Sequence, residues 1–230
     1  MKLAEYRRIV VLTGAGISQA AGLPTYRGPG GLWTDPKLAQ LTDAAALEMR
    51  RPEVCAMFWQ FRQSIRQVEP TAAHRALAAF EARLPEDASF LLITQNVDGL
   101  HQRAGSQQVC EFHGTLLRWY CEVCGEELDP PHGDAPVHCG LLMRPAAVLF
   151  GEMIPPDAVD QASAALEECD LFVAIGTSGT VSPASGFVEW AQENGARSIL
   201  LNLEIDDAAR LAYTECHAGT ADALVTRWFG

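Results

Sequence analysis

The sequence contains no apolar run long enough to cross a membrane and has few basic residues. No run approaches the roughly 18–20 apolar residues of a transmembrane helix. Lys and Arg number 17 against 29 Asp and Glu, a formal charge of −12 at pH 7 with a pI near 4.9. Such a surface repels phosphate backbones. The first eight residues also lack the apolar stretch of a secretory signal. We therefore expect no membrane association, no direct nucleic-acid partner and no secretion.

A disulfide framework is also not indicated. Seven cysteines, an odd number in a chain of 230 residues, favour a reducing compartment. Apolar residues make up 48% and charged residues 20%, so the chain can bury a core and is not disordered. The length fits one large domain, or one domain with a small insertion. We expect an acidic, globular, cytoplasmic protein without internal repeats.

Short, unbroken apolar runs are typical of strands that are buried on both faces. Four such runs occur, at 9–12, 90–93, 171–175 and 199–201. Small or polar residues follow each run, and helical patterns lie between the runs, for example Thr71 to Leu84 and Pro156 to Glu168. Strands that alternate with helices predict an α/β fold, a Rossmann-like, doubly wound parallel sheet with ligands at the carboxyl ends of its strands.

Two stretches interrupt this alternation. Residues 35–68 have helical patterns without a strand and predict a helical insertion. Residues 117–148 hold Cys121, Cys124 and Cys139 around a middle rich in Gly, Pro and Asp, which predicts a small zinc-ribbon-like insertion. The Rossmann-like domain then comprises the remaining ranges 1–34, 69–116 and 149–230.

A glycine turn follows the first predicted strand. The backbone of Gly14–Gly16 can approach a phosphate at the start of a helix. The third glycine of the dinucleotide fingerprint is missing, because Gln19 stands in its place. By itself this turn is equally consistent with an ordinary connection between a strand and a helix. We interpret the glycine-rich segment 22–33, with Tyr26 and Arg27, as a mobile flap over a ligand, with an ordinary surface loop as the alternative.

Polar side chains follow the second predicted strand. Gln95, Asn96 and Asp98 are of the types that hydrogen-bond sugar hydroxyls. His113 precedes Gly114, which allows a close backbone approach, and its imidazole suits general-base catalysis near neutral pH. The alternative for His113 is a structural histidine.

Together these motifs resemble the sirtuins, the family of NAD-dependent protein-lysine deacylases. The matching segments run in family order from about residue 7 to residue 225. They are Gly14–Ser18, Thr94–His101, His113–Gly114, the Cys121/Cys124 pair, Phe150–Glu152, Gly176–Ser178 and Asn202–Glu204.

The resemblance implies that NAD lies across the sheet crevice and is consumed as a co-substrate. The residues implied to bind it are Gly14, Ala15, Gly16, Ile17, Ser18, Tyr26, Arg27, Gln95, Asn96, Asp98, Gly176, Thr177, Ser178, Asn202, Glu204 and Ala221. The implied catalytic residues are His113, Asn96 and Asp98. The implied partner is an acyl-lysine protein or peptide, which pairs as an added strand with Val148, Phe150, Gly151 and Glu152. Family members of this size are often monomers.

The resemblance also implies the chemistry. The acyl oxygen displaces nicotinamide at the ribose C1′, His113 takes a proton through the ribose hydroxyls, and water releases free lysine and 2′-O-acyl-ADP-ribose. The alternatives are a sirtuin-like mono-ADP-ribosyltransferase and a non-catalytic module that senses NAD or ADP-ribose. A redox dehydrogenase fits least, because the dinucleotide fingerprint is incomplete.

The flap is similar to that of the bacterial and mitochondrial branch that removes succinyl and malonyl groups. That branch carries Tyr-x-x-Arg on a helix, where the two side chains clamp the acyl carboxylate. In this sequence Arg62 matches and Trp59 replaces the tyrosine. We expect removal of acetyl groups and also of succinyl and malonyl groups, with Arg62 as the partner of the carboxylate. The alternative is a solvated arginine beside a packed tryptophan.

Sirtuins commonly hold a structural zinc ion with two Cys-x-x-Cys pairs. Cys121 and Cys124 match the first pair and Cys139 matches the last ligand, but a proline stands where the third cysteine belongs. His132 or His138 can supply the fourth ligand. We favour His132, because His138 is adjacent to Cys139 and has less freedom to reach the same ion. The alternative is an insertion that folds without metal.

Overall fold

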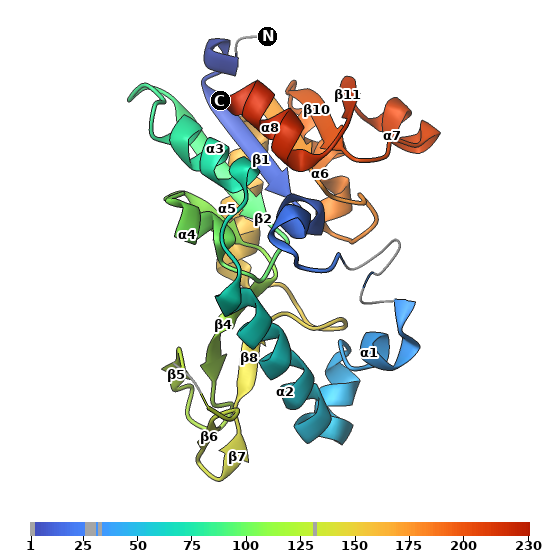
Figure 1. Ribbon diagram of the computed structural model, residues 1–230. Helices are drawn as coiled ribbons and strands as arrows, with labels where there is room; N and C mark the ends of the chain where they lie inside the picture. The colour runs from blue at the N-terminus through green and yellow to red at the C-terminus, as the bar shows by residue number, and fades with distance from the viewer. Residues whose placement is uncertain (1–2, 26–30, 32–33, 131–132) are drawn as a thin grey trace.

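The computed structural model describes residues 3–25, 31, 34–130 and 133–230. It has a larger lobe built on a parallel sheet and a smaller lobe built from two helices and short strands (Figure 1). Tyr26, Arg27 and His132, which the sequence analysis singled out, lie outside the described residues. Among the residues described, none of the helices combines the length and the apolar character needed to span a bilayer.

The larger lobe confirms the expected doubly wound sheet. Its six parallel strands run in the order β11-β10-β9-β1-β2-β3. From β1 the chain adds strands outward on one side, and it then returns to β9 and adds strands on the other, so the strand order reverses between β1 and β9. Ligands of such sheets bind at this reversal. The strands are β1 (Arg8–Thr13), β2 (Ser89–Thr94), β3 (Val109–Glu111), β9 (Leu171–Ile175), β10 (Arg197–Asn202) and β11 (Glu215–Ala218).

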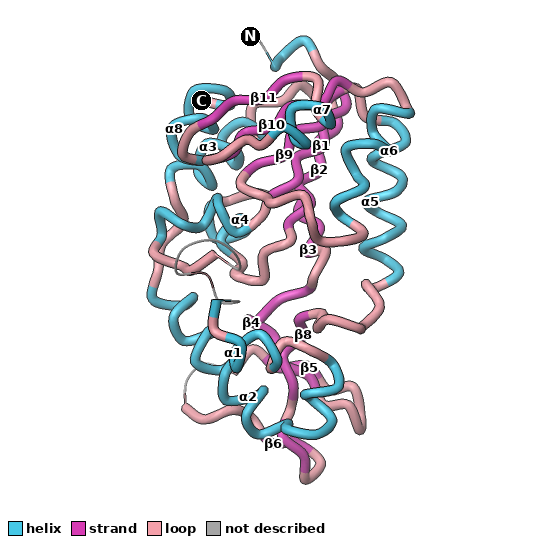
Figure 2. Tube along the Cα trace, turned by 90° about the vertical axis from the view of Figure 1, so that its right-hand side faces the viewer, coloured by secondary structure: helices cyan, strands magenta, loops and turns pink. Residues whose placement is uncertain are grey.

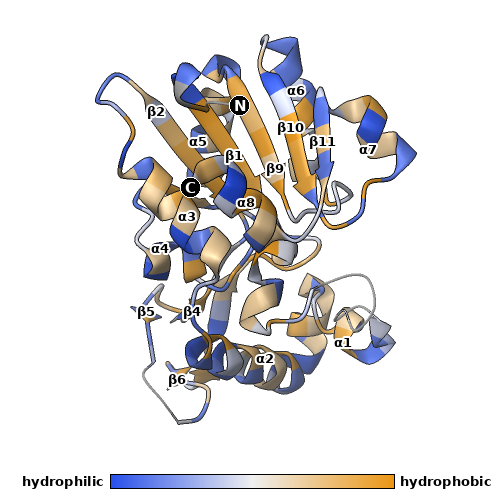
Figure 3. Ribbon diagram, turned by 45° about the horizontal axis from the view of Figure 1, so that its top comes forward, coloured by the Kyte–Doolittle hydropathy of each residue, from blue (hydrophilic) through white to orange (hydrophobic). Residues whose placement is uncertain are grey.

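Helices cover both faces of this sheet (Figure 2). Alternate residues of β1 supply the two cores, because successive side chains of a strand point to opposite faces. Ile9 and Val11 pack in one core with α3 (Ala72–Glu81) and α8 (Ala221–Phe229). Val10 and Leu12 pack in the other core with α5 (Pro156–Glu168) and α6 (Phe187–Glu193). Strands buried on both sides therefore carry the continuous apolar runs seen in Figure 3.

The remaining short helices of the larger lobe connect these layers. Thr71 caps α3 by accepting a hydrogen bond from the backbone N–H of His74, which agrees with the predicted helix start. The other elements are η1 (Leu3–Glu5), η2 (Ala15–Ala21), α4 (Leu100–Ala104), η4 (Ala184–Gly186) and α7 (Asp207–Ala212).

The smaller lobe surrounds one long helix, α2 (Ala44–Gln67), preceded by α1 (Pro36–Gln40). The helix is kinked at Arg50, two residues before Pro52, because a proline inside a helix removes a backbone hydrogen bond and crowds the preceding turn. The short strands are β4 (Gly114–Tyr120), β5 (Glu127–Leu128), β6 (Val137–His138), β7 (Leu141–Leu142) and β8 (Arg144–Ala147). The predicted insertions 35–68 and 117–148 contain most of these elements, although β4 begins ahead of the second.

Two different sides of α2 are buried. Val54, Cys55 and Trp59 pack against Trp119 and Met143 of the smaller lobe. Ile65 packs against Leu23, Val97 and Leu100 of the larger lobe, in a cluster that also includes Leu116 of β4. Helix α2 therefore joins the two lobes, and the side that carries Trp59 and Arg62 is as buried as the apolar stripe next to it.

Candidate functional site

The glycine turn lies at the point where the strand order reverses. The backbone N–H of Gly14 donates to the carbonyl of Ile175, and that of Gly16 donates to the carbonyl of Gly176, over 3.0 and 2.9 Å. A Cβ atom on Gly16 would lie 2.7 Å from the Cα of Gly176, and one on Gly14 would lie 2.8 Å from the Gly176 oxygen. Only glycine permits so close an approach between the loops that follow β1 and β9.

Side chains after β2 hold this turn in place. The Asn96 amide donates from Nδ2 to the Gly14 carbonyl over 3.1 Å and to Ser18 Oγ over 3.3 Å. Ser18 Oγ donates to Asp98 Oδ2 over 2.6 Å, and the other oxygen of Asp98 accepts from the backbone N–H of Leu100. Burial raises the pKa of Asp98, and these two hydrogen bonds oppose that rise only in part. The predicted residues Ser18, Asn96 and Asp98 thus form one buried, connected group.

A cavity of about 30 Å³ adjoins this group. Ala15, Ser18, Asn96 and Asp98 form part of its lining, and α2 contributes Phe61 and Ile65. The sequence analysis did not assign these two apolar residues to the site. Their helical spacing was visible in the sequence, but such a stripe is equally typical of ordinary core packing.

His113 lies between β3 and β4, where the chain passes from the larger lobe to the smaller one. Its Nδ1 is 3.2 Å from the carbonyl oxygen of Gln95. A carbonyl only accepts hydrogen bonds, so this contact assigns the proton to Nδ1 and leaves Nε2 as the basic nitrogen. Burial lowers the pKa of His113, opposed in part by the hydrogen bond to Gln95. The ring is therefore neutral at pH 7, as a general base requires.

The glycine after His113 is required by the geometry of the chain. Gly114 has a φ of +70°, and a Cβ atom there would lie 2.1 Å from the carbonyl oxygen of Ala146. This position brings β4 against β8 and sets the direction of the chain that leaves His113.

The residues predicted for the adenosine side follow β9, β10 and β11. Gln95 donates from Nε2 to Thr177 Oγ1 over 2.9 Å, and Asn202 donates from Nδ2 to the Thr177 carbonyl over 3.1 Å. Ser178 and Gly176 lie in the same loop, Glu204 is exposed after β10, and Ala221 begins α8. Ile17 differs from these residues, because its side chain is fully buried in the core under the turn.

The predicted substrate segment runs beside His113. The backbone N–H of Val148 donates to the His113 carbonyl over 2.9 Å. Phe150 pairs with residues 42–44 ahead of α2, through its N–H to Thr42 and its carbonyl to Ala44. Val148 and Glu152 also line a larger cavity of about 710 Å³ along β3, β4, β8 and the start of α5. The carboxylate of Glu152 faces Arg144 and a backbone amide of its own turn.

The side chains of Trp59 and Arg62 pack against the strands and loops of the smaller lobe. Trp59 donates from Nε1 to the Gly133 carbonyl over 2.8 Å and packs edge-on against Trp119, with ring centroids 5.2 Å apart. The Arg62 side chain is fully buried and donates to Asp129 Oδ1 over 2.5 Å. The charge of Arg62 is thus already paired, which does not favour the expected role as a clamp for an acyl carboxylate. Neither side chain lines the cavity at Asn96 and Asp98.

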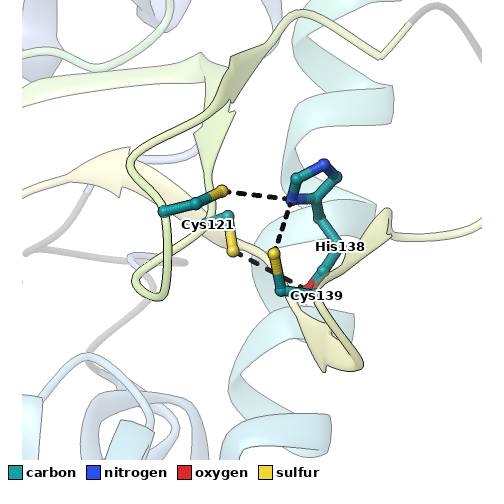
Figure 4. Close-up of side chains that lie close together, drawn as sticks. Cys121, His138 and Cys139 are labelled. Carbon is teal, nitrogen blue, oxygen red and sulfur yellow. Dashed lines mark hydrogen bonds between the residues drawn. The ribbon is translucent and has the colours of Figure 1, made fainter.

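Four possible metal ligands gather in the smaller lobe. Cys121, Cys124, His138 and Cys139 each place a ligand atom within 4.8 Å of the others. Nδ1 of His138 lies 3.3 Å from the sulfur of Cys124 and 3.4 Å from that of Cys139 (Figure 4). The cluster therefore contains His138, whereas the sequence analysis had favoured His132.

The backbone of Cys139 explains how the adjacent His138 can reach the same centre, whereas His132 lies outside the described residues. The φ of 50° at Cys139 lies in the left-handed region, and the following glycine, Gly140, has a φ of 77°. This tight turn between β6 and β7 brings two successive side chains to one centre, which an extended backbone prevents. The local conformation thus removes the objection to adjacent ligands.

Comparison with known families decides to which family the chain belongs. The model of the Sir2 family matches residues 14–183, a range that includes the glycine turn, Asn96, Asp98, His113 and the cysteine cluster. The chain belongs to the Sir2 family.

Individual relatives cover this Sir2-family chain almost completely. A protein of Thermus thermophilus named NAD-dependent protein deacylase is 40% identical over 229 residues, which are 97% of this chain and 90% of the relative. A solved Sir2 homologue in complex with NAD is 33% identical, covers 97% of this chain and 88% of its own, and has a TM-score of 0.86. A Sir2 structure with a deacetylated p53 peptide and 3′-O-acetyl ADP-ribose is 29% identical, covers 99% and 97%, and has a TM-score of 0.81.

Proposed function

We propose that this Sir2-family chain removes acyl groups from protein lysines and consumes NAD, with nicotinamide and 2′-O-acyl-ADP-ribose as products. The observation that carries the proposal is His113, a neutral histidine whose Nε2 is the basic nitrogen. In the same chain the glycine turn and the Asn96–Asp98 group meet at the point where the strand order of the sheet reverses. The names of the relatives support the same activity.

The residues present fit NAD. Gly14 and Gly16 leave no room for side chains, so the turn presents backbone to the crevice, which suits a pyrophosphate. Gln95, Asn96 and Asp98 offer amide and carboxylate groups for the ribose and the carboxamide. NAD supplies an electrophilic ribose carbon and nicotinamide as its leaving group. Asn96 and Ser18 keep the Asp98 carboxylate and the turn at a set distance from each other.

His113 provides the proton transfer. Its Nδ1–H is held by the Gln95 carbonyl, so the ring keeps one tautomer and directs Nε2 as a base. Because burial lowers its pKa, the base is unprotonated at neutral pH. The adjoining segment 148–152 presents the acyl-lysine peptide, and its link to His113 is the hydrogen bond from Val148 N–H.

The test is a mass-spectrometric assay with NAD and an acetyl-lysine peptide. We expect the deacetylated peptide to form only when NAD is present, without any change in NADH absorbance. Peptide that keeps its acetyl group while NAD binds to the protein contradicts the proposal and favours a sensing module. A rise in NADH absorbance also contradicts it and favours redox chemistry.

We propose that acetyl, a neutral acyl group, is the preferred substrate, with succinyl and malonyl groups removed more slowly. The support is that Arg62, the cation that an acidic acyl group needs, is fully buried and ion-paired with Asp129 through Nη2. Phe61 and Ile65 also contribute an apolar lining next to Asn96. A charged acyl group that meets no free cation carries a desolvation cost.

Arg62→Met is therefore expected to lower deacetylation and desuccinylation by similar factors. Arg62 bridges α2 to Asp129 and to the backbone carbonyls of Leu117 and Pro130, so its loss loosens the lobe whatever the acyl group. The measurement is kcat/KM for acetyl- and succinyl-lysine peptides of the same sequence. Arg66→Met is the control, because Arg66 contacts the same Asp129 from a more exposed position. A selective loss of desuccinylation in Arg62→Met contradicts this preference and restores the carboxylate clamp.

We further propose that Cys121, Cys124, His138 and Cys139 hold one structural zinc ion. Three thiolates and one imidazole are a typical donor set for tetrahedral zinc, and the four ligand atoms lie within 4.8 Å of one another. A bound ion would cross-link the chain segments around β4, β6 and β7 of the smaller lobe. Thiolate ligands need reduced cysteines, which suits the cytoplasmic location that we propose from the sequence.

Metal analysis is expected to find about one zinc ion per chain. His138→Ala is expected to weaken zinc retention against a chelator by at least about tenfold, since even the loss of an outer-shell partner commonly costs 10–100-fold. His132→Ala serves as the matched control and should retain zinc like the wild type. A stable preparation without metal, or zinc loss in His132→Ala alone, contradicts the proposed ligand set.

A further inference from the structure

A buried arginine holds the last residue of the proposed substrate segment. Arg144 lies on β8, and its side chain is 5% exposed. Its Nη1 donates to Glu152 Oε1 over 2.5 Å and its Nη2 donates to Glu152 Oε2 over 2.8 Å, which is the two-pronged geometry of a strong arginine–carboxylate pair. Nη2 also donates to the Ala147 carbonyl over 3.1 Å, so one guanidinium contacts the last residue of the segment and the residue that precedes it.

The Glu152 carboxylate closes the turn in which it lies. Its Oε2 accepts from the backbone N–H of Leu149 over 2.7 Å, and the backbone N–H of Glu152 donates to the Leu149 carbonyl over 3.0 Å. Burial raises the pKa of Glu152, but the hydrogen bonds from Arg144 and Leu149 outweigh it and lower the pKa overall. Both carboxylate oxygens are therefore engaged within the protein, and the carboxylate maintains the shape of the segment.

The segment is fixed at three further points. Its first residue, Val148, is hydrogen-bonded to the carbonyl of His113, and Phe150 pairs with Thr42 and Ala44. These contacts set the position of the segment at its start and middle. The turn that ends it is set by the backbone hydrogen bond from Glu152 to Leu149 and by the Glu152 carboxylate, which Arg144 and the Leu149 amide hold.

The ion pair continues toward the metal cluster. Arg144 Nη1 lies 3.7 Å from Glu122 Oε1, and Glu122 directly follows Cys121 of the metal cluster. Arg51 of α2 contacts the other oxygen of Glu122 and also donates to the Leu142 carbonyl over 3.1 Å. The guanidinium of Arg144 further lies 5.3 Å from the centre of the Tyr120 ring. Arg144 is thus itself held from several sides, as a rigid support must be.

We propose that Arg144 is a positioning residue for the acyl-lysine peptide: through Glu152 it holds residues 148–152 in the conformation that pairs with the backbone of the peptide. This inference rests on the proposed function, which gives residues 148–152 the role of the peptide-binding strand. An added strand binds through main-chain hydrogen bonds, so its affinity depends on the backbone geometry of the receiving segment. Freeing Glu152 releases the Leu149 amide and lets the segment sample other conformations, which weakens peptide binding and leaves the NAD crevice intact.

The test is steady-state kinetics of Arg144→Met, Glu152→Ala and the double variant, with acetyl-lysine peptide and NAD varied separately. We expect the KM for peptide to rise by about tenfold or more in each single variant, while kcat and the KM for NAD stay within about twofold. The double variant should be no worse than either single variant, because the pair acts as a unit. Arg144→Lys should recover part of the peptide affinity, since it keeps the charge and loses the two-pronged geometry.

Arg118→Met is the matched control. Arg118 lines the same large cavity and pairs with Glu111, but it is 54% exposed and does not contact the segment. It should keep the wild-type KM for peptide.

An unchanged peptide KM in Arg144→Met, or a parallel loss of kcat, NAD affinity and melting temperature, overturns the inference. If Arg144→Met fails to fold, Arg144→Lys and Glu152→Ala provide the same comparison. If the wild type itself shows no peptide-dependent turnover, the proposed function is wrong. A failure of the present inference instead appears only in the variants, with an active wild type.

Discussion

Replacing His113 by alanine is expected to lower kcat for deacylation by about 10²–10⁴, the usual contribution of a positioned general base. The imidazole is oriented by the hydrogen bond from Nδ1 to the Gln95 carbonyl, and its pKa is lowered mainly by burial. Alanine leaves neither a base nor a group of similar size at this place. The substitution removes no hydrogen bond that holds the glycine turn, so NAD binding should change little.

The measurement is kcat at saturating NAD and acetyl-lysine peptide, together with NAD affinity from calorimetry. In the wild type the acid limb of the pH profile should report an apparent pKa below 6.5, because the folded protein lowers the pKa of His113. His217→Ala is the control, since His217 lies on β11 and pairs with Glu215 away from His113. A His113→Ala variant with wild-type kcat contradicts the proposed mechanism.

The free energy of unfolding is expected to fall by about 3 kcal/mol between pH 6.5 and pH 4 on account of His74 alone. Burial lowers the pKa of His74 from 6.5 to about 4, and each unit corresponds to about 1.4 kcal/mol. His101 is also fully buried, and its ring centroid lies 4.6 Å from that of His74. Burial and, to a lesser extent, the neighbouring His74 lower the pKa of His101 well below its ordinary value. The folded protein therefore binds fewer protons than the unfolded chain, so this stability is complete above pH 6.5 and is lost as the pH falls.

This histidine pair is connected to the candidate site. His101 Nε2 is 3.0 Å from Thr13 Oγ1, and that hydroxyl donates to Thr94 Oγ1, which in turn accepts from the backbone N–H of Asn96. Because Thr13 donates its only hydroxyl proton to Thr94, Nε2–H of His101 donates to Thr13, and protonation places a charge at the buried Nδ1, which has no hydrogen-bond partner among the described residues. We therefore expect activity to be lost in the same pH interval in which stability falls.

The measurement is denaturant unfolding at a series of pH values for the wild type and for His74→Asn. Carboxylates also titrate below pH 5, so the difference between the two proteins isolates the histidine. Asparagine can replace the Nδ1 acceptor that caps Thr71 but does not take up a proton. The variant should show the smaller acid loss, and His217→Ala should behave like the wild type. Equal acid losses in the wild type and His74→Asn contradict the prediction.

The central sheet was predictable because its strands are buried on both faces. The runs 9–12, 90–93, 171–175 and 199–201 each lie within a strand of the structure. The edge strands β3 and β11 were not predicted, since they are three and four residues long and only partly buried. An edge strand shows neither a continuous apolar run nor a clear alternation.

The meeting of Ser18, Asn96 and Asp98 in one connected group was also predictable. The carboxyl ends of neighbouring parallel strands meet at one edge, so the polar residues after β1, β2 and β9 had to gather there. The orientation of side chains on α2 was not predictable, because this helix buries two sides against two lobes. Periodicity identifies the buried residues but does not tell which lobe each side faces, so it did not show that Trp59 packs in the smaller lobe or that Phe61 and Ile65 line the cavity at Asn96. The assignment of Trp59 and Arg62 to the acyl group stays a prediction.

The metal ligands show a different limit. Spacing identified the three cysteines, but the place of His138 beside them depended on the backbone at one residue, Cys139. A left-handed conformation at a residue other than glycine is uncommon and has little signature in the sequence. The flap residues Tyr26 and Arg27 lie outside the described chain, so their assignment to NAD stays a prediction.

The most direct test of the central claim is the stoichiometry of products in one reaction with NAD and an acetyl-lysine peptide. We predict equal amounts of nicotinamide, deacetylated peptide and acetyl-ADP-ribose, and formation of the last two slowed by about 10²–10⁴ with His113→Ala. Nicotinamide released without deacetylated peptide contradicts the claim and assigns the chain to ADP-ribosyl transfer or NAD hydrolysis.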